Sequence, residues 1–244
     1  MIATRLHFTQ ELTVIDQSLM RMGDQVEAML DNAVAAYLEG DVSRVMGVLE
    51  SDDAVDRLDE EIETTSLRLL ATQQPMARDL RRISSAIKVA SELERVGDHC
   101  VEIAKNSRKL IQRCFRSRPL IDIEPMHAVV RKMLAGSLEA FLNHDVALTR
   151  HVCEEDDVVD NMFRSSREEL LHVAQDEASL VAAASYTLLV LVSLERIADH
   201  ATNIAERIYY IETGDLTRIA HEHKRFDLAY QPPDYANGNG NGSH

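Results

Sequence analysis

The clearest hydrophobic pattern in the chain lies near residue 200. Ile197, Ala201, Ile204, Ala205 and Ile208 follow one another at intervals of one, three or four residues. This spacing places the five side chains on one side of an α-helix. Polar and acidic residues fill the positions beside them. The pattern therefore predicts an amphipathic helix with one buried side.

Turn-forming residues divide the rest of the chain into helices of similar kind. Gly40 is expected to end one helix and Asp41 to cap the next. Pro75 marks a break, and Pro125 suits the first turn of a helix, where its missing N–H costs nothing. Only 9 Gly, 5 Pro and 5% aromatic residues favour long helices over a sheet. We predict an all-α protein with helices over residues 9–39, 42–71, 76–112, 124–143, 145–175 and 176–212.

Two sequence blocks occur twice, in the same order. The segment LERVGDH at 93–99 returns as LERIADH at 194–200, and DDAVD at 52–56 returns as DDVVD at 156–160. Ordered repetition of two blocks indicates duplication of one unit. We therefore expect a tandem repeat of two antiparallel three-helix bundles. The expected divisions are 1–112 for the first repeat, 113–123 for a linker, 124–212 for the second repeat, and 213–244 for an extension that is disordered from about 226.

The net charge of the chain limits the classes of molecule that it is expected to bind. With 26 Lys and Arg against 41 Asp and Glu, the formal charge is −15. Nucleic-acid phosphates and anionic lipid headgroups would repel such a chain, whereas cations and basic proteins would attract it. Simple solubility explains the charge at least as well. Cys100, Cys114 and Cys153 form no metal-binding or paired pattern, so we expect reduced thiols in a cytoplasmic protein.

One long uncharged stretch raises the question of a membrane span. Residues 178–194 carry no charge, but they include several Ser and Thr residues and acids flank them at Glu177 and Glu195. Their 17 residues also fall short of the ~20 apolar residues that a bilayer requires. The N-terminus has no apolar core of signal-peptide length. We predict a central bundle helix and no transmembrane segment.

Candidate chemistry lies in four acid pairs spaced four residues apart. The pairs are Asp52/Asp56, Glu94/Asp98, Asp156/Asp160 and Glu195/Asp199. Residues at this spacing lie one helical turn apart on one face, and two carboxylates there repel each other by a few tenths of a kcal/mol. A hard cation is a natural counter-charge, because such ions prefer oxygen ligands. Each repeat is thus predicted to hold a metal site between its second and third helices.

Other interpretations of these acids remain open. A solvated helix face explains any single pair, and Arg95 or Arg196 beside the pairs would then neutralise one member. Their occurrence at repeat-equivalent positions favours metal. His99 and His200 lie about 100° round the helix from the acids, so we expect them to pack or hydrogen-bond rather than ligate. A carboxylate-bridged di-metal enzyme is an alternative, but Glu-x-x-His is not paired between the repeats.

The chain resembles the PhoU family, accessory regulators of high-affinity phosphate transport. The resemblance rests on the opening HFTQEL at 7–12, on Met22-Gly23, on QPMARDLR at 74–81 and above all on the duplicated LERxxDH block. It implies two three-helix bundles, usually assembled as a homodimer. We expect no enzymatic activity, because the sequence has no Gly-rich phosphate loop and no nucleophile motif. The resemblance also implies repression of the phosphate-starvation response through contacts with the transporter's ATPase subunit and a sensor histidine kinase, which would bring the cytoplasmic protein to the inner face of the membrane.

The resemblance further implies multinuclear sites for divalent or trivalent metals, with iron, zinc, manganese, magnesium and nickel as candidates. Carried over residue by residue, the implied metal ligands are Asp52, Asp56, Glu94, Asp98 and Glu102 in the first repeat, and Asp156, Asp160, Glu195, Asp199 and Asn203 in the second. The repeats differ here, because Asn203 replaces the charge of Glu102. The Pro-x-Ala-x-Asp-Leu-Arg block before Glu94 also has no counterpart before Glu195.

Overall fold

The computed structural model describes residues 2–114 and 119–214, with side chains placed for 8–113 and 119–214. These residues form α1 (Ile2–Glu39), α2 (Val42–Gln73), α3 (Arg78–Cys114), α4 (Glu124–Asn143), α5 (Val146–Asp176), the 3-10 turn η1 (Ala178–Leu180) and α6 (Val181–Thr213). No strand occurs among them, so the all-α prediction is confirmed. The side chain of Cys114 and the expected disorder from about 226 lie outside the described residues.

Most helix ends lie where turn chemistry predicts them. Gly40 has a positive φ of 68°, and the Asp41 carboxylate accepts a hydrogen bond of 2.8 Å from the backbone N–H of Ser43. Asp145 plays the same part before α5 by accepting from the N–H groups of residues 147 and 148. Each cap satisfies amide donors that the first helical turn leaves unpaired. Pro125 occupies the first turn of α4, as expected.

Several helix boundaries differ from the sequence-based prediction, and three of the differences have a local explanation. The first helix begins at Ile2 instead of residue 9, and no Gly or Pro lies in between to stop it. The third helix begins two residues later than predicted, because Ala77 has a left-handed φ of 47°. The last two helices do not meet at 175/176. Glu177 is extended there, and its carboxylate accepts a hydrogen bond from the Ser179 hydroxyl, so a 3-10 turn precedes α6.

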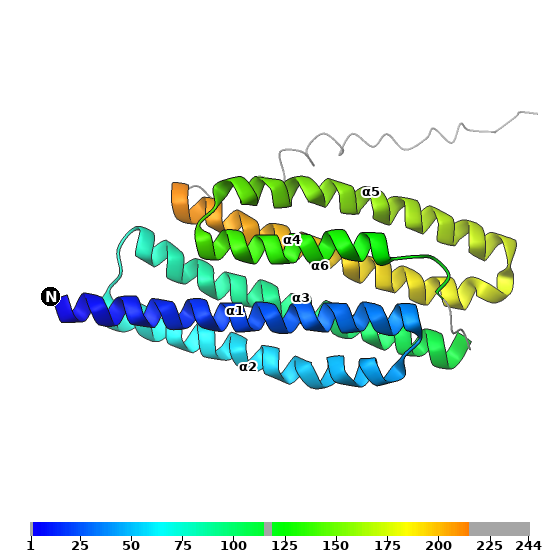
Figure 1. Ribbon diagram of the computed structural model, residues 1–244, viewed down its shortest axis with the longest axis horizontal. Helices are drawn as coiled ribbons and strands as arrows, with labels where there is room; N and C mark the ends of the chain where they lie inside the picture. The colour runs from blue at the N-terminus through cyan, green and yellow to red at the C-terminus, as the bar shows by residue number, and fades with distance from the viewer. Residues whose placement is uncertain (1, 115–118, 215–244) are drawn as a thin grey trace, which may run out of the picture.

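The helices form two bundles that lie side by side along their length (Figure 1). In the first, α1, α2 and α3 all pack against one another, and in the second α4, α5 and α6 do the same. The bundles meet mainly through α3 and α6, with a smaller contact between α1 and α4. These observations confirm the predicted pair of three-helix bundles. The two central helices therefore carry both the core of each bundle and the interface between them.

The two central helices run antiparallel. Arg81, near the start of α3, donates two hydrogen bonds of 3.0 and 2.9 Å to the carbonyl of Ile211 near the end of α6. Arg78 adds an ion pair of 2.6 Å with Glu212. Both arginines belong to the 74–81 block that only the first repeat possesses. One structural role of that block is thus to hold the end of α6.

A pair of repeat-equivalent histidines marks the centre of this interface. His99 and His200 stack with ring centroids 5.4 Å apart. This contact between equivalent residues of two antiparallel helices indicates that the repeats are related by an approximate local two-fold rotation near the pair. Both histidines therefore pack, one of the two roles expected of them.

The core is aliphatic and runs through both bundles. Fully buried side chains include Leu19, Met22 and Leu30 of α1, Ile83 of α3 and Ile204 of α6. By length and composition alone, one helical segment among the described residues, Ala178–Thr213, is apolar enough to cross a membrane. Here α6 packs against α3, α4 and α5. That position favours the central bundle helix expected from the sequence.

Candidate functional site

The first acid cluster lies between α2 and α3, beside Gly97 of α3. A Cβ atom added to Gly97 would lie 3.4 Å from Val55 and 3.9 Å from Oδ1 of Asp52, both ordinary contacts, so Gly97 of α3 faces α2 beside Asp52. Burial raises the pKa of Asp52, and the charges of Asp56 and Asp98 raise it further. The structure therefore brings the predicted acids of α2 and α3 together across one seam.

Glu94 belongs to the same cluster. Burial raises its pKa, followed by the charges of Asp98, Asp59 and Asp56, and the opposing charge of Arg95 does not reverse the shift. Asp59 is a member that the sequence analysis missed. Asp59 follows Asp56 by three residues and so continues the row of acids on one face of α2 by about one turn. This spacing is the sequence feature that could have identified it. The raised pKa values indicate negative charge that the neighbouring cations do not fully balance.

Glu102, the last predicted member of the first site, lies one turn beyond Asp98. Its carboxylate is half exposed and forms an ion pair of 3.4 Å with Lys105. The charge of Lys105 also lowers the pKa of Asp52, against the larger effects of burial and of Asp56 and Asp98. Lys105 is thus the cation on this side of the cluster.

The second acid cluster lies between α5 and α6 and is balanced differently. Asp156 is buried, with 3% of its surface exposed, and Asp160 follows one turn later, half-buried. Burial raises the pKa of Cys153 to about 12, with further contributions from Glu206 and Asp156, which places acids of both helices around this thiol. A thiol held protonated in this way is a poor metal ligand and a poor nucleophile.

Arg196 neutralises part of the second cluster. Its guanidinium lies 3.0 Å from Asp199 and 3.5 Å from Glu195, so it contacts both predicted ligands of α6. The sequence analysis gave such pairing of an arginine with the acids as an alternative to metal binding. The two clusters are therefore equivalent in position and unequal in charge compensation.

Asn203, the remaining predicted ligand, faces the other bundle. Its amide nitrogen donates a 3.1 Å hydrogen bond to Glu92 of α3, and His200 Nδ1 lies 2.7 Å from the same carboxylate oxygen. Burial raises the pKa of Glu92, but the two hydrogen bonds and the charges of His200 and Arg207 together hold it below its ordinary value. Sequence analysis missed Glu92, because its repeat equivalent is Ser193 and no motif includes it.

The donor chemistry suits a hard cation, since both clusters offer carboxylate oxygens from two helices. Within 8–113 and 119–214, however, no three His, Cys, Asp or Glu side chains are already arranged to hold a metal ion. The structure thus gathers the candidate ligands without forming a ready-made cage, and metal binding stays a prediction.

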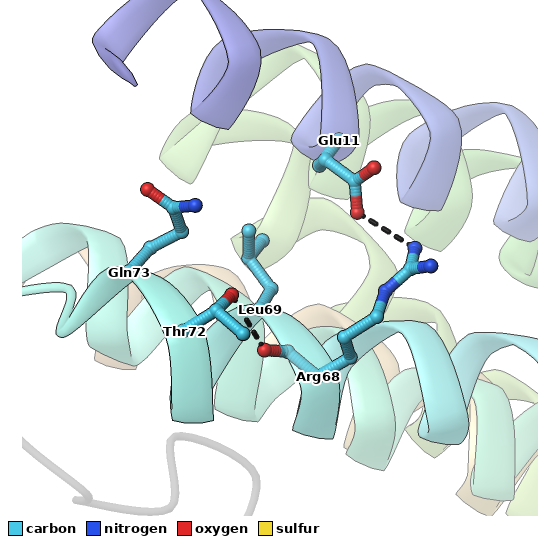
Figure 2. Close-up of a pocket in the computed structure, with 5 residues that line it drawn as sticks. All are labelled: Glu11, Arg68, Leu69, Thr72 and Gln73. Carbon is cyan, nitrogen blue, oxygen red and sulfur yellow. Dashed lines mark hydrogen bonds and ion pairs between the residues drawn. The ribbon is translucent and has the colours of Figure 1, made fainter.

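A separate pocket of about 360 Å³ lies between α1 and α2, near the end of α2 (Figure 2). Its lining consists of Glu11, Arg68, Leu69, Thr72 and Gln73. Arg68 forms a 2.8 Å ion pair with Glu11 across the opening, and the Thr72 hydroxyl donates to the carbonyl of Arg68. The pocket includes none of the predicted metal ligands.

Two solved structures resemble the whole two-bundle arrangement. A crystal structure of PhoU from Pseudomonas aeruginosa matches with a TM-score of 0.82 and 32% identity, covering 85% of this chain and 100% of that chain. The phosphate transport system regulatory protein PhoU from Streptococcus pneumoniae matches with a TM-score of 0.79 and 30% identity, covering 86% and 99%.

Sequence comparisons agree with the structural ones. A phosphate-specific transport system accessory protein PhoU homolog from Clostridium acetobutylicum is 33% identical over 86% of this chain and 96% of its own length. A homolog of the same description from Caulobacter vibrioides is 34% identical over 85% and 90%. The family model for the PhoU domain matches residues 19–107 and again 123–208, once in each bundle. The chain therefore belongs to the PhoU family.

Proposed function

We propose that this protein is an accessory protein of a phosphate-specific transport system and represses the phosphate-starvation response when phosphate is plentiful. The observation that carries the proposal is the match of the PhoU domain to both bundles, together with relatives of that description aligned over nearly their full length. The duplicated LERxxDH block lies within both matched regions.

We propose that the protein acts as an adaptor, through contacts with its partners and not through catalysis. The protein would link the ATPase subunit of the transporter to a sensor histidine kinase, in the cytoplasm at the inner face of the membrane. A formal charge of −15 suits docking to basic surfaces of such partners. These contacts should weaken at high salt, because exposed charges are screened beyond about 8–10 Å at physiological ionic strength.

Metal binding is the second part of the proposal. A divalent or trivalent ion between α2 and α3 would offset the repulsion that raises the pKa of Asp52 and Glu94. Asp52, Asp56, Glu94 and Asp98 would supply oxygen ligands, with Asp156, Asp160, Glu195 and Asp199 in the equivalent positions of the second bundle. When bound, the ion would join the two helices of a seam.

Elemental analysis of protein purified without an affinity tag tests metal binding. The double variant Asp98→Ala, Asp199→Ala should contain less bound metal and remain folded. The variant Glu50→Ala, which removes an exposed acid of α2, should keep the metal content of the unmodified protein. Unchanged metal content in the double variant would remove the proposed sites.

A genetic experiment tests the regulatory role. Deleting the gene should activate a phosphate-starvation reporter in phosphate-rich medium, and restoring the gene should silence it again. If the reporter stays silent after deletion, the regulatory proposal fails. A metal-dependent turnover assay on the purified protein would then test the carboxylate-bridged di-metal enzyme instead.

A further inference from the structure

Two exposed leucines lie on the first bundle, near the end of α2 and the beginning of α3. Leu67 of α2 keeps 52% of its surface exposed, and Leu80 of α3 keeps 45%. Leu70 and Ile87, one and two turns away on the same two helices, are half-buried. We call Leu67, Leu70, Leu80 and Ile87 the α2/α3 apolar face.

The helical register brings these four side chains to one seam. The charge of Asp59 raises the pKa of Glu94, which places the two carboxylates near each other across α2 and α3. Leu67 follows Asp59 by eight residues, and Ile87 precedes Glu94 by seven. Because α2 and α3 are antiparallel, both steps lead the same way along the seam, by about 11–12 Å. The other two members follow at spacings of three and seven residues, which keeps them on the same sides of their helices.

The second bundle repeats the exposed pair. Leu171 follows Leu67 by 104 residues, the offset of the acid blocks, and Val181 follows Leu80 by 101 residues, the offset of the LERxxDH blocks. Leu171 and Val181 keep 51% and 49% of their surface exposed. The α2–α3 and α5–α6 connections lie at opposite ends of the molecule (Figure 1), so each end carries one such pair. This recurrence distinguishes the four residues from apolar side chains scattered singly over a surface.

The charges beside the two pairs have opposite sign. Glu60 and Glu63 are exposed and lie seven and four residues before Leu67, on the same side of α2. Burial raises the pKa of the nearby Asp59, and the charges of Glu63, Asp56 and Glu60 raise it further. Negative charge therefore gathers beside the α2/α3 apolar face. The positions of α5 equivalent to Asp59, Glu60 and Glu63 hold Phe163, Arg164 and Arg167.

The cations of α3 lie on the other edge of the α2/α3 apolar face. Lys88 and Arg95 are exposed, four residues before and three residues after Glu92. Glu92 contacts His200 of α6, so this side of α3 borders the second bundle. A helix laid along the face would meet apolar side chains at its centre, acids over α2 and cations over α3.

We propose that the α2/α3 apolar face binds an amphipathic helix of a partner protein, whose apolar side covers the face and whose basic residues lie over Asp59, Glu60 and Glu63. The proposal rests on the adaptor function proposed above and locates one of its contact surfaces. Amphipathic helices dock on apolar surfaces through side chains three or four residues apart. Charge complementarity then selects the helix and its orientation, and the arginines beside the second pair repel the same helix.

A synthetic helix tests the face in the full-length protein. The probe is a fluorescent amphipathic peptide of about 18 residues, or five helical turns, with Leu on one side and Lys on the other. Fluorescence anisotropy measures its affinity. The variant Leu67→Ser, Leu80→Ser should bind the probe at least ~10-fold more weakly, because the helix loses two central apolar contacts. Both positions are exposed, so the variant should remain folded.

The matched control is Leu171→Ser, Val181→Ser, which removes the equivalent exposed pair of the second bundle. It should bind the probe as tightly as the unmodified protein. Equal weakening by the two double variants would overturn the proposal, and so would failure of the unmodified protein to bind the probe. Self-association that is lost in Leu67→Ser, Leu80→Ser without any probe would also overturn it and would assign the face to a second copy of the chain.

A charge reversal tests the acidic edge. The variant Glu60→Lys, Glu63→Lys should bind the Lys probe more weakly and should bind a second probe, in which Glu replaces every Lys, more tightly. An unchanged preference between the two probes would overturn the proposal. The gene-deletion experiment separates this result from the adaptor function. A reporter that stays silent after deletion counts against the adaptor function alone, whereas an activated reporter with no probe binding counts against the face alone.

Discussion

At the scale of single residues, the two acid clusters differ in what balances their charge. Asp52 and Glu94 have raised pKa values, owing first to burial and then to neighbouring acids. In the second bundle, the Arg196 guanidinium contacts both Asp199 and Glu195. A carboxylate whose charged neighbours are mainly other carboxylates destabilises the metal-free fold, whereas one that pairs with arginine does not. Equivalent substitutions in the two clusters should therefore act in different directions.

We predict that Asp98→Asn stabilises the metal-free protein and that Asp199→Asn does not. Removing the charge of Asp98 relieves repulsion with Asp52 and Glu94, which is worth a few tenths of a kcal/mol. Removing the charge of Asp199 takes a partner from Arg196 and costs up to about 0.5 kcal/mol. Urea unfolding in the presence of a chelator measures both free energies. An equal increase in the free energy of unfolding of both variants would show that Arg196 does not balance the negative charge of the second cluster.

The gain from neutralising Asp52 should depend on pH. Its folded-state pKa lies above the ordinary value of 3.8, so the folded protein binds more protons than the unfolded chain between those two values. Stability from this group is therefore lost as pH rises through the folded pKa. We predict that Asp52→Asn is more stable than the unmodified protein at pH 7, and that its advantage shrinks as pH falls towards 4. Urea titrations across this range test it, and an advantage that grows on acidification would contradict the assignment.

At the scale of helices, two glycines show how closely the elements pack. A methyl group at Gly97 would lie 3.4 Å from Val55, an ordinary contact, whereas one at Gly23 would collide with the side chain of Leu138. Alanine favours a helix by up to about 1 kcal/mol over glycine. We predict that Gly97→Ala raises the free energy of unfolding by about 0.5–1 kcal/mol and that Gly23→Ala brings no gain. Urea unfolding compares them, and a clear loss in Gly97→Ala would indicate a seam tighter than the structure has it.

The helices themselves could be predicted because their ends carry local signals. Gly40 with Asp41, and Asp145, cap helices through hydrogen bonds to residues only two or three positions away. Such bonds depend on neighbouring residue types and so can be inferred from the sequence. The junction after α5 was missed, because Ser179 and Glu177 form it through one side-chain contact that has no strong sequence signature.

At the scale of the whole molecule, the sequence predicted the repeat but not the interface between repeats. The duplicated blocks predict the acids of each seam, and in the first seam the structure brings the acids of α2 and α3 near one another. Glu92 lies at the interface and accepts from His200 and Asn203 of the other bundle, more than 100 residues away. A contact of this range depends on how the bundles dock, and no periodicity within either helix records it. The sequence therefore predicts Asn203 as a metal ligand, whereas in the structure its amide donates a hydrogen bond to Glu92.

The interface also predicts how the molecule unfolds. Because α3 and α6 provide both the bundle cores and the contact between bundles, losing either helix exposes the core of both. We expect one cooperative urea transition, with amide protons of α2 and α5 exchanging at similar free energies. Glu92→Ala leaves His200 and Asn203 without their shared acceptor and should lower stability by about 1–3 kcal/mol. Hydrogen exchange should show this loss in both bundles, and a loss confined to one bundle would mean that the repeats unfold independently.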